Sequence, residues 1–154
     1  EIIPKLQEKM KEQQRDMKYI VLPRYQEQYE HLSKIFAREI EDGQIILRKN
    51  ISNLAHVMYF SAMVVSGGGT MVRESALLGV PSIEFIGSDT YPQERFLIEN
   101  GFPLIHVKDP DAVITQIGKF LDENPKTETW ERIENLDNPI EVALKVFKKT
   151  IKSH

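Results

Sequence analysis

The chain has 154 residues, 41% of them hydrophobic, which is enough for one domain with a sizeable buried core. Its 20 basic and 23 acidic residues are well mixed, and the net charge of -3 excludes a broad basic surface for nucleic acid or an anionic membrane. The absence of cysteine excludes disulfides and thiolate chemistry, and no apolar run approaches the roughly 18 residues of a membrane span. We expect a cytoplasmic protein without a cofactor, a nucleic-acid partner or a membrane span.

Short apolar strands alternate with helical segments along the chain. A thin apolar stripe in the charged segment 7–16 predicts a peripheral opening helix within residues 1–17. Continuous apolar runs predict strands at residues 19–22, 44–47, 63–65, 82–86 and 104–107. Apolar residues at helical spacing predict helices at residues 29–40, 54–60, 70–78, 93–100 and 109 to about 124, and a last helix from about residue 139.

This alternation predicts an α/β fold. The expected architecture is a doubly wound, Rossmann-like parallel sheet of about five to six strands with helices on both faces. A closed eightfold barrel is excluded because it needs about 250 residues. We expect residues 1–154 to form a single domain. Because position 1 is Glu rather than Met, we also expect this domain to be cut from a longer protein.

The most informative segment is the glycine run that follows the strand at residues 63–65. Ser66 leads into Gly67, Gly68 and Gly69, and a helix is predicted to begin at Thr70. Such a turn directs unpaired backbone N–H groups and the positive end of a helix dipole at one point, where a phosphate binds readily. Glycines allow close approach because they lack a Cβ atom. The alternative is a tight connection without a ligand.

Three common motifs are excluded at this turn. It is not a P-loop because no Gly-Lys-Ser/Thr follows, and it is not a dinucleotide fingerprint because Val72 stands where the last glycine belongs. Ser66 is not a hydrolase nucleophile because Val64 occupies the place of the leading glycine. The turn therefore disfavours a plain NTPase, an NAD enzyme and a serine hydrolase.

Other ligand-binding candidates follow the strands, because open parallel sheets bind ligands beyond the carboxyl ends of their strands. Arg24 follows the first strand and can serve as a phosphate clamp, or remain an exposed surface arginine. Glu74 lies one turn into the helix, about a sugar's width from the glycines, and can accept hydrogen bonds from a ribose or simply face solvent. Tyr91 and Gln93 can face a base or sugar, although loop tyrosines often only pack.

The remaining polar residues form no evident catalytic constellation. Structural roles without a metal are expected for three histidines, His31, His56 and His106, which lack metal-ligand spacing. Asp89 and Glu94 can form a carboxylate pair, but a solvated loop is the preferred interpretation. Arg73 is expected to face solvent or to pair with an acid.

The order of these parts resembles a known fold. The run VVSGGGTMVRESALLGVPSIEF at residues 64–85, followed by YPQERFLIENG at residues 91–101, resembles the C-terminal half of two-domain type-B glycosyltransferases. It is similar to an uncharacterised, largely archaeal family described as glycosyltransferase-like. It also resembles non-hydrolysing UDP-N-acetylglucosamine 2-epimerases and the peptidoglycan N-acetylglucosaminyltransferase. The resemblance covers roughly residues 18–110.

The resemblance implies roles for particular residues. Ser66, Gly67 and Gly68 match the turn that touches the nucleotide phosphates, and Glu74 matches a glutamate that holds the ribose. Two departures argue against epimerase activity. The epimerases have one residue fewer between serine and glutamate, and their Thr-Glu-Arg-Pro-Glu motif has only a loose counterpart in residues 91–95. Their histidine after the first strand is replaced here by Arg24 or its neighbours.

We expect this chain to be the half of a glycosyltransferase or related epimerase that binds the nucleotide sugar. The expected ligand is a UDP-linked sugar. The expected partner is an N-terminal Rossmann-like domain absent from this chain, so the isolated domain is expected to be inactive. The alternatives are a non-catalytic Rossmann-like binding or regulatory module and, more weakly, a receiver domain, for which no acidic cluster follows the first strand. The catalytic residues are unknown, and the predicted ligand-binding residues are Arg24, Ser66, Gly67, Gly68, Gly69, Thr70, Glu74, Tyr91 and Gln93.

Overall fold

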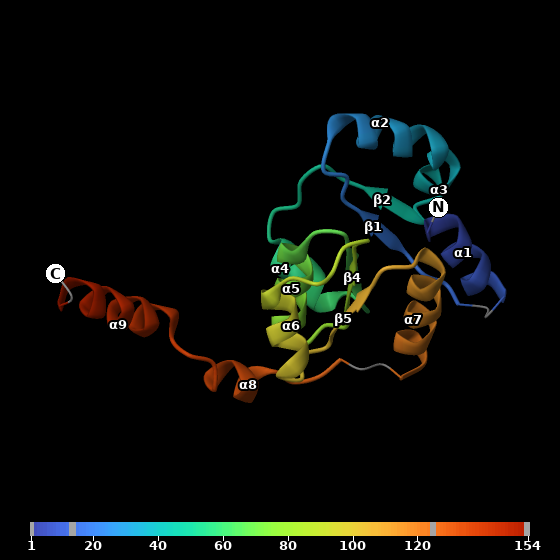
Figure 1. Ribbon diagram of the computed structural model, residues 1–154. Helices are drawn as coiled ribbons and strands as arrows, with labels where there is room; N and C mark the ends of the chain where they lie inside the picture. The colour runs from blue at the N-terminus through green and yellow to red at the C-terminus, as the bar shows by residue number, and fades with distance from the viewer. Residues whose placement is uncertain (1, 13–14, 124–125, 153–154) are drawn as a thin grey trace.

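The computed structural model describes residues 2–12, 15–123 and 126–152 (Figure 1). Its strands are β1 (Tyr19–Val21), β2 (Ile45–Leu47), β3 (Val64–Ser66), β4 (Ser82–Phe85) and β5 (Leu104–Val107). Its helices are α1 (Ile2–Glu12), α2 (Gln26–Ile35), α3 (Ala37–Glu41), α4 (Leu54–Phe60), α5 (Gly69–Leu77), α6 (Pro92–Glu99), α7 (Pro110–Glu123), α8 (Trp130–Glu134) and α9 (Pro139–Lys152). The predicted α/β class with parallel strands is confirmed.

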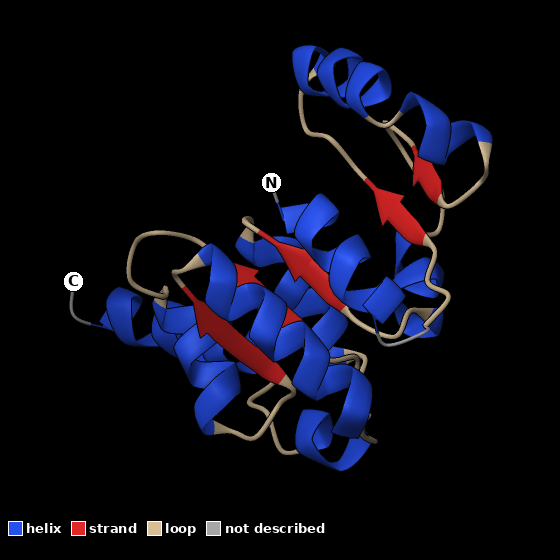
Figure 2. Cartoon of the chain, turned by 90° about the vertical axis from the view of Figure 1, so that its right-hand side faces the viewer, coloured by secondary structure: helices blue, strands red, loops and turns tan. Residues whose placement is uncertain are grey.

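The strands form two parallel sheets within the described residues, rather than the single sheet of five to six strands that was predicted. β1 pairs with β2, and β3, β4 and β5 form a second sheet with β4 in the centre (Figure 2). Side-chain packing connects the two, because Tyr19 of β1 contacts the core cluster that contains Ile83 of β4. Apolar periodicity identifies strands but does not specify their neighbours, so the predicted sheet size was wrong.

The main core lies between β4, α7 and α1. Its buried members are Leu6, Met10, Ile83, Val113, Ile117 and Phe120. α1 packs beside α7 (Figure 1) and brings Leu6 and Met10, four residues apart, onto one buried face. The opening helix therefore contributes more to the core than its thin apolar stripe predicted.

The opposite face of the three-stranded sheet is covered by α5 and α6. Val72 and Ala76 of α5 pack with Leu97 of α6 and Leu104 of β5. Side chains alternate along β4, so Ile83 faces α7 whereas the neighbouring Ser82 contacts α5 through a hydrogen bond between its hydroxyl and that of Ser75. The next residue on the α5 face is Glu84. This alternation brings polar β4 side chains beneath the helices that line the candidate site.

Two helical features differ from the predictions. The helix expected over residues 29–40 is divided at Phe36 into α2 and α3, and α8 was not predicted. α9 extends away from the sheets (Figure 1), and its apolar side chains, including Phe147, are exposed. The predicted end of α7 near residues 124–125 falls outside the described residues. Within the described ranges, every helix is too short or too polar to cross a membrane.

Candidate functional site

The glycine turn joins β3 to α5 as predicted. β3 ends at Ser66, α5 begins at Gly69, and the Ser66 hydroxyl accepts a hydrogen bond from the Gly68 N–H at 3.1 Å. None of the three turn glycines, Gly67, Gly68 and Gly69, has a positive φ. Their backbone conformation therefore does not require glycine. Close approach requires a glycine at two of the three positions, Gly67 and Gly69. A Cβ atom on Gly67 would lie 3.1 Å from the Phe85 carbonyl oxygen, and one on Gly69 would lie 2.1 Å from Oε1 of Glu94.

A buried ion pair lies directly beside this turn. Arg73 Nη1 donates to Oε1 of Glu94 at 2.7 Å, and Glu94 is fully buried while about a third of the Arg73 side chain is exposed. A second guanidinium nitrogen of Arg73 contacts the Thr70 hydroxyl at 3.4 Å. Of the two predictions for Arg73, pairing with an acid is confirmed. The prediction of a solvated Glu94 was wrong, because α6 directs this side chain inward under α5.

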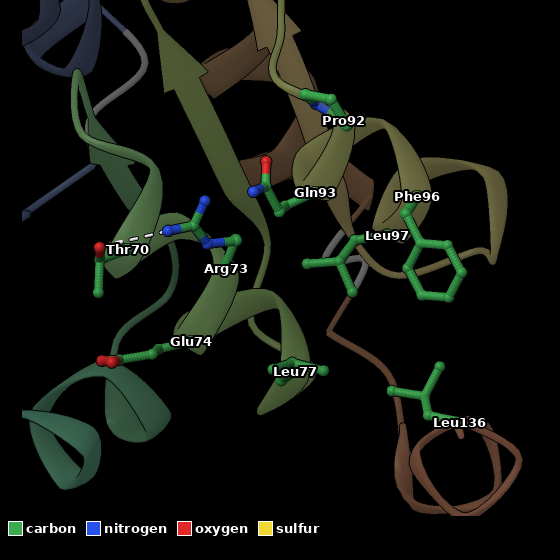
Figure 3. A pocket seen from close by; sticks show the side chains of 9 residues that line it. All are labelled: Thr70, Arg73, Glu74, Leu77, Pro92, Gln93, Phe96, Leu97 and Leu136. Carbon is green, nitrogen blue, oxygen red and sulfur yellow. Dashed lines mark hydrogen bonds between the residues drawn. The ribbon is translucent and has the colours of Figure 1, made fainter. Parts of the chain in front are cut away.

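An open cavity of about 570 Å³ lies between α5 and α6 (Figure 3). Its lining consists of Thr70, Arg73, Glu74, Leu77, Pro92, Gln93, Phe96, Leu97 and Leu136. Arg73 and Gln93 face each other at its centre, whereas Phe96 and Leu136 lie together at one side (Figure 3). Glu74 points away from that apolar side (Figure 3). The cavity thus combines a polar end near the glycine turn with an apolar wall.

Only some of the predicted ligand-binding residues line the cavity, and the others lie elsewhere in the fold. Thr70, Glu74 and Gln93 line the cavity, and the glycine turn lies next to it in the chain. Tyr91 is the half-exposed residue that precedes α6 and does not belong to the cavity lining. Arg24 follows β1, in the other sheet, and its guanidinium lies 5.5 Å from the centre of the Tyr25 ring. β1 does not pair with β3, the strand that leads into the glycine turn, in the described structure.

A second buried polar pair was missed by the sequence interpretation. Glu84 is fully buried in β4, and its Oε2 lies 2.8 Å from Nδ1 of His106 in β5 and 3.0 Å from the Thr90 hydroxyl. The strand register pairs Glu84 with His106 directly. An acid and a histidine at matching positions of two adjacent predicted strands are the signal that would have found this pair. His106 therefore has an acid partner that its neighbours in the sequence do not reveal.

The loop after β4 is tied to the end of β5 by a surface ion pair. The Lys108 ammonium donates to the Asp89 carboxylate, and this hydrogen bond together with the positive charge of Lys108 lowers the pKa of Asp89 below its usual value. Asp89 is exposed, whereas Glu94 is buried. The two acids therefore do not form the carboxylate pair that was considered. Across the described ranges, no group of three His, Asp or Glu side chains is placed to hold a metal ion.

Fold and site together define an α/β protein with parallel strands and an open cavity beside a glycine turn at a helix N-terminus. The chain belongs to the family described as "Protein of unknown function (DUF354)", which matches residues 1–152. It is similar to the uncharacterized protein MJ0665 of Methanocaldococcus jannaschii, with 31% identity over 143 residues. That match covers 88% of this chain but only 39% of the archaeal protein. No solved structure matches the chain.

Proposed function

We propose that this chain binds a nucleotide sugar in the cavity between α5 and α6, with the diphosphate at the N-terminus of α5. The observation that carries the proposal is that Thr70, the residue that follows the glycine turn in α5, lines the cavity. Its volume of about 570 Å³ is in the range of small-molecule sites. The turn offers backbone N–H groups and a helix dipole to an anion at the polar end of this cavity.

Arg73 is the cation that supports phosphate binding. Its guanidinium has five N–H donors, and the pair with Glu94 uses one nitrogen while another faces Thr70. About a third of the side chain is exposed toward the cavity. One guanidinium can therefore hold Glu94 and a phosphate oxygen together, as the planar arrangement of its donors permits.

The rest of the cavity suits a nucleoside. Leu77, Phe96, Leu97 and Leu136 offer an apolar wall for a base, and Gln93 offers an amide that both donates and accepts hydrogen bonds. Glu74, exposed at the same cavity, is the proposed acceptor for ribose hydroxyl groups. The sequence resemblance to type-B glycosyltransferases supports this assignment and favours a UDP-linked sugar.

We infer that transfer of the sugar requires a second domain in addition to this chain. The chain spans 39% of the length of its archaeal relative. In the proposed enzyme, an additional N-terminal Rossmann-like domain supplies the acceptor site, while the glycine turn stabilises the negative charge of a departing diphosphate. The domain alone is then a binding module without turnover.

Titration by NMR tests the binding proposal. UDP, UDP-N-acetylglucosamine and ADP are added separately, and amide shifts are followed around the turn. We expect binding at millimolar affinity or better, with shifts from Ser66 through Glu74 and at Gln93. Unchanged amides in this region with all three ligands would contradict the proposal.

One observation favours a second candidate, a non-catalytic module in which the turn is purely structural. The Glu94 carboxylate already lies against Gly69, the first residue of α5, where it offsets part of the positive end of the helix dipole. Under this alternative, the same titrations show no shifts, and Glu94→Gln does not create phosphate binding. Under the nucleotide-sugar proposal, Glu94→Gln strengthens binding of inorganic pyrophosphate, because it removes a competing negative charge.

A further inference from the structure

We propose that α9 lies flat on the surface of an anionic lipid membrane, with its apolar side chains among the lipids and its lysines against the headgroups. The inference is independent of the nucleotide-sugar proposal, because α9 does not belong to the lining of the cavity between α5 and α6. It assigns a partner to the part of the chain that points away from the sheets (Figure 1).

The exposure of α9 is the first observation. Every side chain from Pro139 to Ile151 is exposed. Six large apolar residues, with exposed fractions between 44% and 69%, are among them: Ile140, Val142, Leu144, Val146, Phe147 and Ile151. A contiguous apolar surface of this kind marks an interaction site.

The distribution of these residues around the helix axis is the second observation. At about 100° per residue, the six residues and Ala143 occupy one arc of about 200°, which runs from Val142 to Leu144. Thr150 is the one polar residue within this apolar arc, and its hydroxyl donates to the Val146 carbonyl at 3.1 Å. A helix that packs one face on a protein core has a narrower apolar stripe, of roughly 100°. The apolar arc of α9 is therefore wide enough for immersion in an apolar boundary.

Positive charge on the rest of the circumference is the third observation. α9 contains four lysines and one glutamate, a charge of +3, whereas the whole chain has a net charge of -3, so the residues outside α9 together carry -6. Lys148 adjoins the edge of the apolar arc at Leu144. Lys149 adjoins the other edge, at Val142. Lysines at both edges can lay their methylene groups over the apolar surface while the ammonium groups reach the headgroups.

Charge complementarity selects an anionic lipid surface over other occupants. Two copies of α9 paired along their apolar arcs would bring the lysines at the edges together, and repulsion between like charges opposes this pairing. A nucleic acid would neutralise the lysines but leave the apolar arc in water. An anionic membrane satisfies both faces, because basic amphipathic helices lie in its interface with the apolar side inward.

The length of α9 fixes its orientation on the membrane. Its 14 residues make a helix about 21 Å long, which is shorter than the hydrocarbon core of about 30 Å. The helix therefore lies on the membrane instead of crossing it. The positive charge is confined to this one helix, so the proposal requires no broad basic surface on the rest of the chain.

Co-sedimentation of the unmodified chain with lipid vesicles is the primary experiment. Vesicles of phosphatidylcholine alone are compared with vesicles that also contain phosphatidylglycerol, at low and at high salt. We expect the chain to pellet with the phosphatidylglycerol vesicles at low salt, and much less at high salt, because salt screens the attraction of the lysines. A chain that stays in the supernatant with both vesicle types overturns the proposal. Equal binding to both types at both salt concentrations overturns it as well.

Variants test the two faces of the helix separately. Phe147→Asp is expected to lower the affinity for phosphatidylglycerol vesicles about tenfold or more, because it removes an apolar side chain and adds a negative charge. Phe60→Asp makes the same change at an exposed phenylalanine of α4 and should leave the affinity unchanged. Lys148→Gln should lower the affinity about fivefold, the effect of one lysine at an anionic surface, whereas Lys34→Gln, at an exposed position of α2, should not.

Circular dichroism shows that each variant is folded, which is expected because all four side chains are exposed. Unchanged vesicle binding in both α9 variants, or equal losses in the two controls, would overturn the proposal.

Two other occupants of the apolar arc would give different results. If a second copy covers it, the chain is a dimer in sedimentation equilibrium without lipid, and Phe147→Asp restores the monomer. If another part of a longer protein covers it, the α9 amides exchange slowly in that protein without lipid. Either result, together with no binding to anionic vesicles, assigns the arc to that occupant and overturns the membrane proposal.

Discussion

The carboxylate of Glu94 lies directly against the backbone of Gly69, where a Cβ atom would come within 2.1 Å of Oε1. Two segments 25 positions apart in the chain, the first residue of α5 and the first turn of α6, therefore meet at the edge of the candidate site. The contact explains why a glycine opens α5 even though its backbone angles suit other residues. It also fixes Arg73, because the same carboxylate oxygen accepts the hydrogen bond from its guanidinium.

Replacing Gly69 with alanine is expected to destabilise the protein by about 1–3 kcal/mol, as overpacking does in other cores. Glu94 is fully buried, so it can move aside only by weakening its pair with Arg73. The measurement is urea unfolding followed by circular dichroism. Gly87→Ala is the matched control, because a Cβ atom there meets nothing within 4 Å. Equal stability of the two variants would show that the contact with Glu94 imposes no constraint.

Removing Arg73 is expected to leave an uncompensated buried charge on Glu94. We expect Arg73→Met to reduce the free energy of unfolding by about 1–3 kcal/mol. The double variant with Glu94→Met should lose less than the sum of the single variants. As a control, Arg38→Met removes an exposed partner of Asp42 at 3.8 Å and should cost about 0.5 kcal/mol or less. Strict additivity for Arg73 and Glu94 would contradict a coupled pair.

Asp89 is expected to titrate below the ordinary aspartate range, since the hydrogen bond from Lys108 favours its ionised form. A carboxyl group whose pKa is lower in the folded state stabilises the fold above its unfolded-state pKa. This stabilisation is lost as the pH falls through the folded-state value. Carboxyl NMR shifts measured against pH provide the test. Lys108→Met should raise the pKa of Asp89, whereas an unchanged titration would show that the ion pair is absent in solution.

Glu74→Ala is expected to weaken binding of UDP about tenfold, the loss of a hydrogen bond to a charged acceptor. Binding of inorganic pyrophosphate should stay the same, because the proposed contact is with the ribose. Calorimetric titration of both ligands separates the two effects. Glu99→Ala, at the far end of α6, is a matched change of an exposed glutamate and should alter neither affinity. A parallel loss for both ligands would contradict a specific contact between Glu74 and the ribose.

The helices and strands around the site could be predicted because their signals are local. The apolar run before Ser66, the glycines and the amphipathic segment after them indicate a strand, a turn and a helix, and the structure has these elements there. The division at Phe36 and the short helix α8 were not predicted, since neither has a strong local signal. The size of the sheet could not be predicted from local sequence patterns either, because strand pairing depends on segments that are distant in the chain.

The sequence by itself determined the α/β class and the position of the glycine turn, because backbone conformation and apolar periodicity depend on neighbouring residues. Only the tertiary structure decided which charged groups are buried together. Arg73 meets Glu94 across 21 positions, and Glu84 meets His106 across 22. Helix packing brings the first pair together and strand register the second. A buried charge is tolerated only where such packing supplies its partner, so these contacts belong to the folded arrangement and not to any local pattern.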